Sequence, residues 1–259
     1  MVLICVKMIK KKNTYNLFNL FLFSHLVIWT SIPAFTNTNL PLDTIEALAW
    51  GSNLDWGFSK HPPLSAFLAE TFYQIFGKQD WAYYFLSQLC VLVSFYFVWK
   101  LAEEFFENNL LSLISVLLLE GIYFFNFTTP EFNVNVCELP FWSLSVYYFW
   151  KSFKNNKLKD WCLFGLFSAL GFLSKYLFIY LLLSISFFLI YRSLKIKTFK
   201  KNYLIPVLIF IAILSPHFYW LLKNDFITII YGLNRTGLEV SNNIDHLINP
   251  VIFIIKQFF

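Results

Sequence analysis

The sequence carries little charge for its length. Of its 259 residues, only 14% are Asp, Glu, Lys or Arg, against about 25% in typical globular proteins. Apolar residues make up 58% and aromatic residues 22%, including 33 Phe, which is more than a soluble core of this size could bury. The abundance of aromatic side chains also excludes a disordered chain. The composition therefore predicts a multi-spanning membrane protein of the all-α class.

Cysteine is scarce as well. None of the 4 Cys residues forms a C-x-x-C pair, and no Cys/His cluster has the spacing of a zinc site. We expect the cysteines to be small apolar residues in or near the membrane. The net charge is +5, but the basic residues stand in short clusters between apolar runs, so there is no basic face for nucleic acid. We predict no disulfide framework, no redox site and no nucleic-acid partner.

Apolar runs long enough to cross a membrane recur along the chain. A spanning helix needs about 20 mostly apolar residues, and the candidates are 15–35, 81–99, 110–127, 134–150 and 203–222. Residues 161–191 would make a single helix about 46 Å long, but Lys175 interrupts the run, which predicts a hairpin of two short helices. A further run starts at about Leu247. We expect about seven transmembrane helices and the start of an eighth, in one integral-membrane domain over residues 1–259.

The basic residues predict the direction of these spans. Fourteen of the 20 Lys and Arg lie in the segments 1–14, 100–109, 151–160 and 192–202. Five lie in the segments 36–80, 128–133, 174–176 and 223–246. The positive-inside rule places the first set, and with it the N-terminus, in the cytoplasm. Both flanks of the hairpin then lie inside, so Lys175 faces outward. We expect a multi-pass protein of the bacterial inner (plasma) membrane.

The long outer segment 36–80 concentrates the polar side chains. Within nineteen residues it carries two acids near a helix start, a third acid and two basic groups: Asp43, Glu46, Asp55, Lys60 and His61. Asp43 is followed three residues later by Glu46, a spacing that resembles a capping box. A short amphipathic helix is predicted there, and a second one over 64–76, after two prolines. Both are expected to lie on the membrane surface.

Each of these side chains also has a purely structural interpretation. Asp43 alone could cap a helix, and Glu46 could be a first-turn acid favoured by the helix dipole. Lys60 and His61 could simply face lipid phosphates. Their density in one outer segment, in a chain with so little charge, favours a functional site.

Four motifs follow one another along the chain. They are I-E-A-L-A-W-G-S-N-L-D-W-G-F-S-K-H-P-P-L (45–64), T-T-P-E-F-N (128–133), L-G-F-L-S-K-Y (170–176) and L-S-P-H-F-Y-W-L-L-K-N-D-F (214–226), the last followed by Arg235. In this order they resemble the polyprenyl-phosphate-sugar glycosyltransferases of the GT-C class, which include the protein O-mannosyltransferases and the lipid A aminoarabinose transferase. The resemblance covers most of the chain from residue 40.

The chain departs from these relatives in two ways. The first motif of these relatives often has the sequence D-E-A-Y-Y-W, and this chain has Ile45 at the position of the Asp. The acids nearest to that position are Asp43 and Glu46. Relatives are also commonly longer, with more spans and a soluble outer domain, so we expect this chain to be truncated at its C-terminal end.

The resemblance implies transfer of a sugar from a polyprenyl-phosphate donor to a lipid, glycan or protein acceptor at the outer face. A carboxylate must take the proton of the acceptor, and Asp43 is the first candidate, with Glu46 the second. Cations must neutralise the phosphate leaving group. The candidates for this role are Lys60, His61, Lys175 and Arg235, although Lys175 could instead extend along the membrane toward water.

Further candidates follow from the later motifs. Glu131 and Asn133 are expected to contact the sugar or the acceptor, with loop capping as the alternative. Tyr176 and His217 complete the substrate-binding set, although His217 also fits a buried core histidine. His61 and His217 with Glu46 or Glu131 could hold a divalent cation, and the sequence identifies no other cofactor. Glu120 and Glu138 lie in or near spans, where they would pair with a Lys or His or mark a polar cavity.

Two other functions compete with this interpretation. The chain could be an inactive, truncated remnant of a transferase. It could also be a polytopic transporter or scaffold, because transporters carry ionisable residues too. In transporters, however, the ionisable residues lie near the middle of the membrane, and the chain often contains inverted repeats. Here no clear repeat is found and the charges gather at the outer boundary, which favours the glycosyltransferase.

Overall fold

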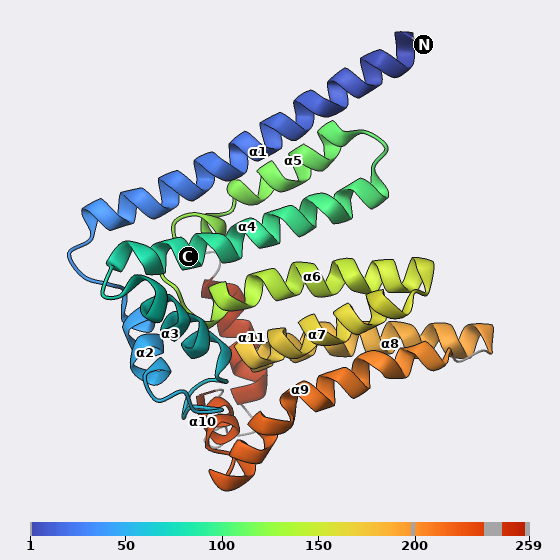
Figure 1. Cartoon of the computed structure of the whole chain (residues 1–259). Helices are drawn as coiled ribbons and strands as arrows, with labels where there is room; N and C mark the ends of the chain where they lie inside the picture. The colour runs from blue at the N-terminus through green and yellow to red at the C-terminus, as the bar shows by residue number, and fades with distance from the viewer. Residues whose placement is uncertain (1, 198–199, 236–244, 257–259) are drawn as a thin grey trace.

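The computed structural model describes residues 2–197, 200–235 and 245–256, and all regular secondary structure in them is helical. The long helices run side by side in Figure 1 and are α1 (Val2–Thr36), α4 (Asp80–Phe105), α6 (Val134–Asn155), α7 (Leu158–Ser174), α8 (Ile179–Ile196) and α9 (Leu204–Lys223). The shorter ones are α2 (Leu42–Gly51), α3 (Leu64–Phe76), α5 (Asn109–Glu120), α10 (Ile227–Arg235) and α11 (Asp245–Lys256). The predicted all-α class is confirmed for the described residues.

Four helical segments of the described chain are long and apolar enough to cross a membrane. They are Asn13–Thr36, Asp80–Phe105, Tyr176–Ile196 and Lys201–Lys223. They overlap the spans predicted at 15–35, 81–99 and 203–222 and the second arm of the hairpin. Helices α6 and α7 form where spans were predicted but are not among these four. The chain therefore has the helices of a membrane protein, without support for the full count of about seven spans.

The span predicted at 110–127 is wrong in its length. Helix α5 ends at Glu120 and has 12 residues, about 18 Å of helix against the ~30 Å of a hydrocarbon core. The chain turns there because polar side chains bind its backbone. Asn126 Nδ2 donates a hydrogen bond to the backbone oxygen of Glu120 at 2.6 Å. A short 3₁₀ turn, Tyr123–Phe125, follows.

The predicted hairpin over 161–191 is confirmed. Helix α7 ends at Ser174, Lys175 is extended with φ −160° and ψ 134°, and α8 starts at Ile179. The reversal is tight because Gly171 has no side chain: a Cβ there would lie 2.4 Å from the ring of Phe178. The two helices run in opposite directions, as Figure 1 shows.

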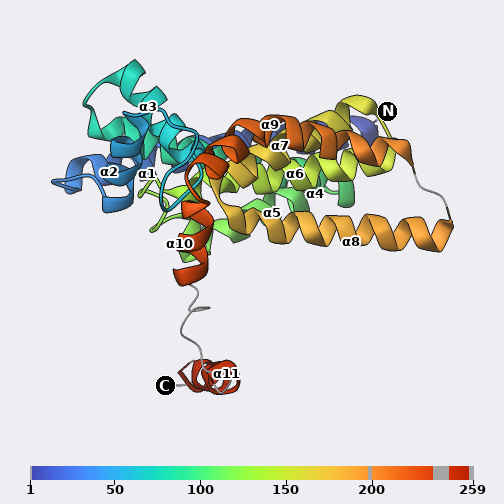
Figure 2. The ribbon, with the colours of Figure 1, turned by 90° about the horizontal axis from the view of Figure 1, so that it is seen from below.

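The chain alternates between two ends of the bundle. The N-terminal end of α1, the connections α4–α5 and α6–α7, the last turn of α8 and the first turn of α9 lie at one end (Figures 1 and 2). Lys154 bonds Glu104 there at 2.8 Å. Helices α2, α3 and α10 gather at the opposite end, together with the turn at Lys175. The structure thus separates the same segments that the charge pattern separates, and we call the end with α2, α3 and α10 the outer end.

Two apolar clusters support the outer end. The first, beneath α2 and α3, joins them to α4 and α6 through Ala47, Ala69, Leu86, Cys90, Phe132, Val136 and Cys137. The second holds α1 and α5 against α4 through Phe18, Val91, Phe95, Trp99, Leu113 and Val116. Helix α7 packs between α6 and α9. The polar segments of the outer end therefore rest on a packed helical base.

Candidate functional site

Both short helices predicted for the outer segment 36–80 are present. Helix α3 has the predicted bounds, Leu64–Phe76, and α2 spans Leu42–Gly51. The capping box predicted for Asp43 and Glu46 is wrong, because the N-cap of α2 is Pro41, two residues before Asp43, and no side chain caps the helix. The backbone N–H of Asp43 instead donates to Glu131 Oε1 at 3.2 Å. Glu131 thus takes the place of the missing cap from another segment.

Four of the predicted site residues line one small pocket: Asp43, Glu46, His61 and Asn133. Its remaining walls come from Ala47, Trp50, Ser65 and Val134. Lys60 forms an ion pair with Glu46 at its edge. The structure therefore brings both candidate bases together with two of the candidate phosphate ligands.

The electrostatics of His61 connect the remaining cations to this pocket. Burial lowers the pKa of His61, and the negative charges of Glu46 and Asp43 raise it in part. The positive charges of Lys175 and Arg235 lower it further. The hydrogen bond and the charge of Glu46 raise the pKa of Lys60. The charges of Glu46, Asp43, Lys175 and Arg235 thus all act on His61, which is mostly neutral at pH 7.

Lys175 is held in place by the first turns of α6. Its Nζ donates a hydrogen bond to Asn135 Oδ1. Burial lowers the pKa of Lys175, opposed by the charge of Glu138 and reinforced by that of Arg235. Glu138 is itself 8% exposed, and its Oε1 has no hydrogen-bond partner among the described residues. Lys175 therefore lies partly out of water, where water would screen its attraction to an anion less than at the surface.

Tyr176 and His217 form a brace between α9 and the loop that carries Lys60. His217 is fully buried. Its Nδ1 lies 2.6 Å from the backbone oxygen of Trp56, which can only accept a hydrogen bond, so Nδ1 carries a proton. Nε2 of the neutral ring then accepts from the hydroxyl of Tyr176 at 2.7 Å. The interpretation of His217 as a core histidine fits this geometry.

The same loop is fixed at three further points. A Cβ on Gly57 would lie 2.3 Å from the ring of Trp220, so the loop backbone rests directly on that ring. Thr228 Oγ1 of α10 donates to the Phe58 oxygen at 2.5 Å, and the Phe58 N–H donates to the His61 oxygen at 3.1 Å. Lys60 and His61 are thus positioned by α9 and α10.

The predicted divalent-cation site does not form. Both ring nitrogens of His217 are already bonded to Trp56 and Tyr176. Within residues 2–197, 200–235 and 245–256, no group of three or more His, Cys, Asp or Glu side chains is arranged to hold a metal ion. The pairing of His61 and His217 with Glu46 or Glu131 is therefore wrong.

Glu131 and Asn133 have capping geometry. Glu131 accepts the Asp43 N–H, as described above. Asn133 is the N-cap of α6, where its Oδ1 accepts from the N–H groups of Asn135 and Val136 at 2.9 and 3.1 Å. Asn133 nevertheless lines the pocket with Asp43, so its contact with substrate stays a prediction.

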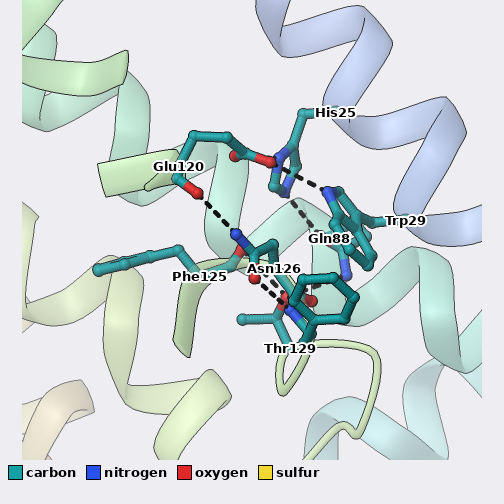
Figure 3. A network of polar contacts seen from close by, with 8 residues as sticks. His25, Trp29, Gln88, Glu120, Phe125, Asn126 and Thr129 are labelled. Carbon is teal, nitrogen blue, oxygen red and sulfur yellow. Dashed lines mark hydrogen bonds and ion pairs between the residues drawn. The ribbon is translucent and has the colours of Figure 1, made fainter. Parts of the chain in front are cut away.

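One of the alternatives predicted for Glu120, a pair with a histidine, is observed in the polar network drawn in Figure 3, but the other members of this network were not predicted. Glu120 pairs with His25 of α1, with 2.8 Å between Oε2 and Nδ1. His25 Nε2 lies 3.0 Å from Gln88 Oε1, and Gln88 Nε2 donates to Thr129 Oγ1 at 3.4 Å. A single histidine in the middle of an apolar span is a signal for such a network, because polar groups in a membrane need partners.

Comparisons with known proteins point to one family. A model of the dolichyl-phosphate-mannose-protein mannosyltransferase family matches residues 60–220. The matched range holds most of the candidate residues and ends before Arg235; Asp43 and Glu46 precede it. No curated protein and no solved structure matches the chain.

Proposed function

The chain belongs to the dolichyl-phosphate-mannose-protein mannosyltransferase family and so to the membrane glycosyltransferases of the GT-C type, and from this premise we propose that it transfers a sugar from a polyprenyl-phosphate donor. The acceptor is a lipid, a glycan or a protein. The reaction takes place at the outer end of the bundle, on the outer face of a bacterial inner membrane, with the N-terminus in the cytoplasm.

One observation supports this proposal most strongly: two carboxylates line one small pocket with His61, and Lys60 forms an ion pair with one of them, Glu46, at the edge of the pocket. The acceptor hydroxyl oxygen attacks the anomeric carbon and loses its proton to a carboxylate. The bond between that carbon and the phosphate oxygen breaks, and polyprenyl phosphate leaves with the electron pair. Cations around the phosphate stabilise the charge that develops there. The candidate bases Asp43 and Glu46 line the pocket, and the cation Lys60 is bonded to Glu46 at its edge.

Asp43 is the better candidate for the base. Its side chain is exposed at the start of α2 and makes no ion pair among the described residues, so it is free to accept a proton. Glu46 is already engaged by Lys60. In our proposal, Glu46 orients Lys60 toward the donor phosphate.

The phosphate is held by groups from several elements. Lys60 and His61 come from the braced loop, Lys175 from the turn after α7, and Arg235 from the end of α10. Lys175 is the strongest of these, because a partly buried cation is less screened by water. Glu131 and Asn133 contact the sugar or acceptor, and Tyr176 and His217 complete the substrate-binding region by holding the loop.

The test is a transfer assay with a radiolabelled polyprenyl-phosphate sugar in proteoliposomes. Asp43→Asn keeps the size of the side chain but removes the proton acceptor, so turnover should fall by about 10²–10⁴-fold while donor binding persists. Asp55→Asn is the matched control: Asp55 is an exposed acid of the same segment that is not among the residues lining the pocket.

Glu46→Gln separates the two candidate acids. If Glu46→Gln abolishes transfer while Asp43→Asn is as active as wild type, the base is Glu46 and our assignment is wrong. If wild type and all three variants transfer sugar at the same rate, neither carboxylate is the base and the proposed mechanism fails.

A further inference from the structure

The polar network of Figure 3 joins four segments of the chain. His25 belongs to α1, Gln88 to α4 and Glu120 to the end of α5, and Thr129 lies in the connection to α6. Gln88 and Thr129 are fully buried, and His25 is 3% exposed. Trp29 Nε1 also donates to Glu120 Oε1 at 3.1 Å, so both carboxylate oxygens are bonded.

The hydrogen-bond geometry fixes the protons of this network. The hydroxyl of Thr129 donates to the backbone oxygens of Asn126 and Phe125 at 3.1 and 3.2 Å, so it must accept from Gln88 Nε2. Gln88 Oε1 then faces His25, whose Nε2 carries a proton. One further proton lies between His25 Nδ1 and Glu120 Oε2. The pair is neutral as a whole, which suits a position among apolar helices.

The network ends next to the candidate site. Two residues after Thr129, Glu131 accepts the Asp43 N–H at 3.2 Å. The next residue, Phe132, accepts from Thr44 Oγ1 at 3.1 Å through its backbone oxygen. Thr44 is 1% exposed. The segment 129–132 is therefore bonded to the network at one end and to the first turn of α2 at the other.

The hydrogen bonds of Asn126 and Thr129 provide partners for polar backbone groups between α5 and α6. Helix α5 stops early, so residues 121–133 run largely as irregular backbone between α5 and α6. Backbone N–H and C=O groups among apolar helices must find partners, and irregular backbone is tolerated only where they do. Asn126 and Thr129 supply those partners for the oxygens of Glu120, Phe125 and Asn126.

We propose that the Glu120–His25–Gln88–Thr129 network is a positioning device for the outer site. It fixes the segment 126–133, and through Glu131 and Phe132 that segment fixes the first turn of α2, which carries Asp43. Thr129 is the joint, because it connects the side-chain network to the segment's own backbone. The catalytic part of this inference rests on the proposed function; the structural part does not.

The experiment compares two neighbouring threonines. Thr129→Val removes the hydroxyl at nearly constant shape. Thr128→Val is the matched control, because the Thr128 hydroxyl also bonds a backbone oxygen, that of Phe124 at 2.7 Å, without touching Gln88. Hydrogen exchange of the Asp43 amide is followed by mass spectrometry of the peptide around residues 41–46. We expect it to be about tenfold faster in Thr129→Val, the change given by one ordinary hydrogen bond, and unchanged in Thr128→Val.

Two further measurements distinguish positioning from general stability. Thr129→Ser restores the hydroxyl and should restore slow exchange. In the transfer assay, Thr129→Val should lower kcat about tenfold while the KM for the donor stays the same, because Lys60 and His61 are held by α9 and α10, and Lys175 is held by Asn135 of α6, rather than by the segment 126–133. Should Thr129→Val not fold, Gln88→Met removes the bonds to His25 and Thr129 at similar volume, and the same outcomes apply to it.

The results separate this inference from the proposed function. Equal exchange of the Asp43 amide in wild type, Thr129→Val and Gln88→Met would overturn the positioning role. If the Asp43 amide exchanges faster in Thr129→Val but the wild-type protein transfers no sugar, the positioning role is upheld and the proposed function is contradicted. Faster exchange with an unchanged kcat would show that the device does not serve catalysis and would overturn the inference in its catalytic part.

Discussion

Replacing Gly57 with alanine tests how firmly α9 holds the loop that carries Lys60 and His61. A Cβ at Gly57 would lie 2.3 Å from Trp220 Cε3 and 2.5 Å from Cζ3, distances that real contacts do not reach. Gly57 is not among the residues with positive φ, so alanine suits its backbone conformation. The whole effect of the substitution is therefore the displacement of the ring or of the loop.

The expected magnitude is that of overpacking a filled interior, about 1–3 kcal/mol of lost stability. Unfolding of the purified protein by SDS titration in mixed micelles measures it. Gly232→Ala is the control, because a Cβ there meets no heavy atom within 4 Å. Gly232 lies inside α10, where alanine stabilises a helix by roughly 0.5–1 kcal/mol relative to glycine.

A double substitution sharpens this test. Trp220→Phe shortens the ring that meets the new methyl group, so Gly57→Ala should cost clearly less in that background. The coupling between contacting residues is typically about 0.5–3 kcal/mol. The reasoning is refuted if Gly57→Ala is as stable as wild type, or if its cost is the same with Phe at position 220.

Two further predictions concern pH and topology. Burial holds the pKa of His61 below its unfolded value of about 6.5. As the pH falls, the unfolded state therefore binds a proton at His61 before the folded state does. The stability contributed by neutral His61 is complete above about pH 6.5 and is lost as the pH falls below it. His61→Asn should therefore lose less stability than wild type when unfolding is compared at pH 7.5 and about pH 5.5, and equal losses would contradict this. The substitutions Ser52→Cys and Asn155→Cys, each in a cysteine-free background, test the orientation, because both positions are exposed and they lie at opposite ends of the bundle. A membrane-impermeant thiol reagent applied to intact cells should label Ser52→Cys and spare Asn155→Cys. The reverse pattern would show that the orientation is inverted.

The helices of the outer end could be predicted well from local signals. Pro62 and Pro63 precede α3, and an apolar pattern continues to its end at Phe76. Lys175 interrupts an otherwise apolar stretch, and the chain reverses there. In each case the residues that decide the structure lie within a few positions of the boundary.

The errors arose where partners are distant in the sequence. Asp43 and Glu46 have the spacing of a capping box, but Pro41 fixes the start of α2, and the N–H of Asp43 bonds Glu131, 88 positions away. The side chain of Glu120, at the end of α5, pairs with His25, 95 positions away. No local pattern contains this information, since it depends on how α1, α4 and α5 pack.

Several residues of the candidate site could be selected from the sequence, but their arrangement in space could not be predicted from it. The pocket is lined by Asp43, Glu46, His61 and Asn133, of which Asp43 was selected as an acid near a predicted helix start and the other three lie in the motifs. His217 and Tyr176 were also selected, but they bond each other and the Trp56 backbone. Residues in one motif can thus support a site without lining it, and only the packing of α9 against the loop distinguishes the two roles.

The central claim is that the outer-end cations hold the phosphate of a polyprenyl lipid, and a binding measurement tests it most directly. Native mass spectrometry of the detergent-purified protein would compare polyprenyl phosphate with the unphosphorylated polyprenol for wild type, Lys175→Ala and Lys78→Ala. Lys78 is an exposed lysine of the same outer segment and does not appear among the charges that act on His61.

Loss of a charge-assisted hydrogen bond of about 1.5–3 kcal/mol should weaken phosphate binding by roughly 10–100-fold in Lys175→Ala. Lys78→Ala should bind like wild type, and wild type should prefer polyprenyl phosphate over polyprenol. Equal binding of the two lipids by wild type, or wild-type affinity in Lys175→Ala, would contradict the account.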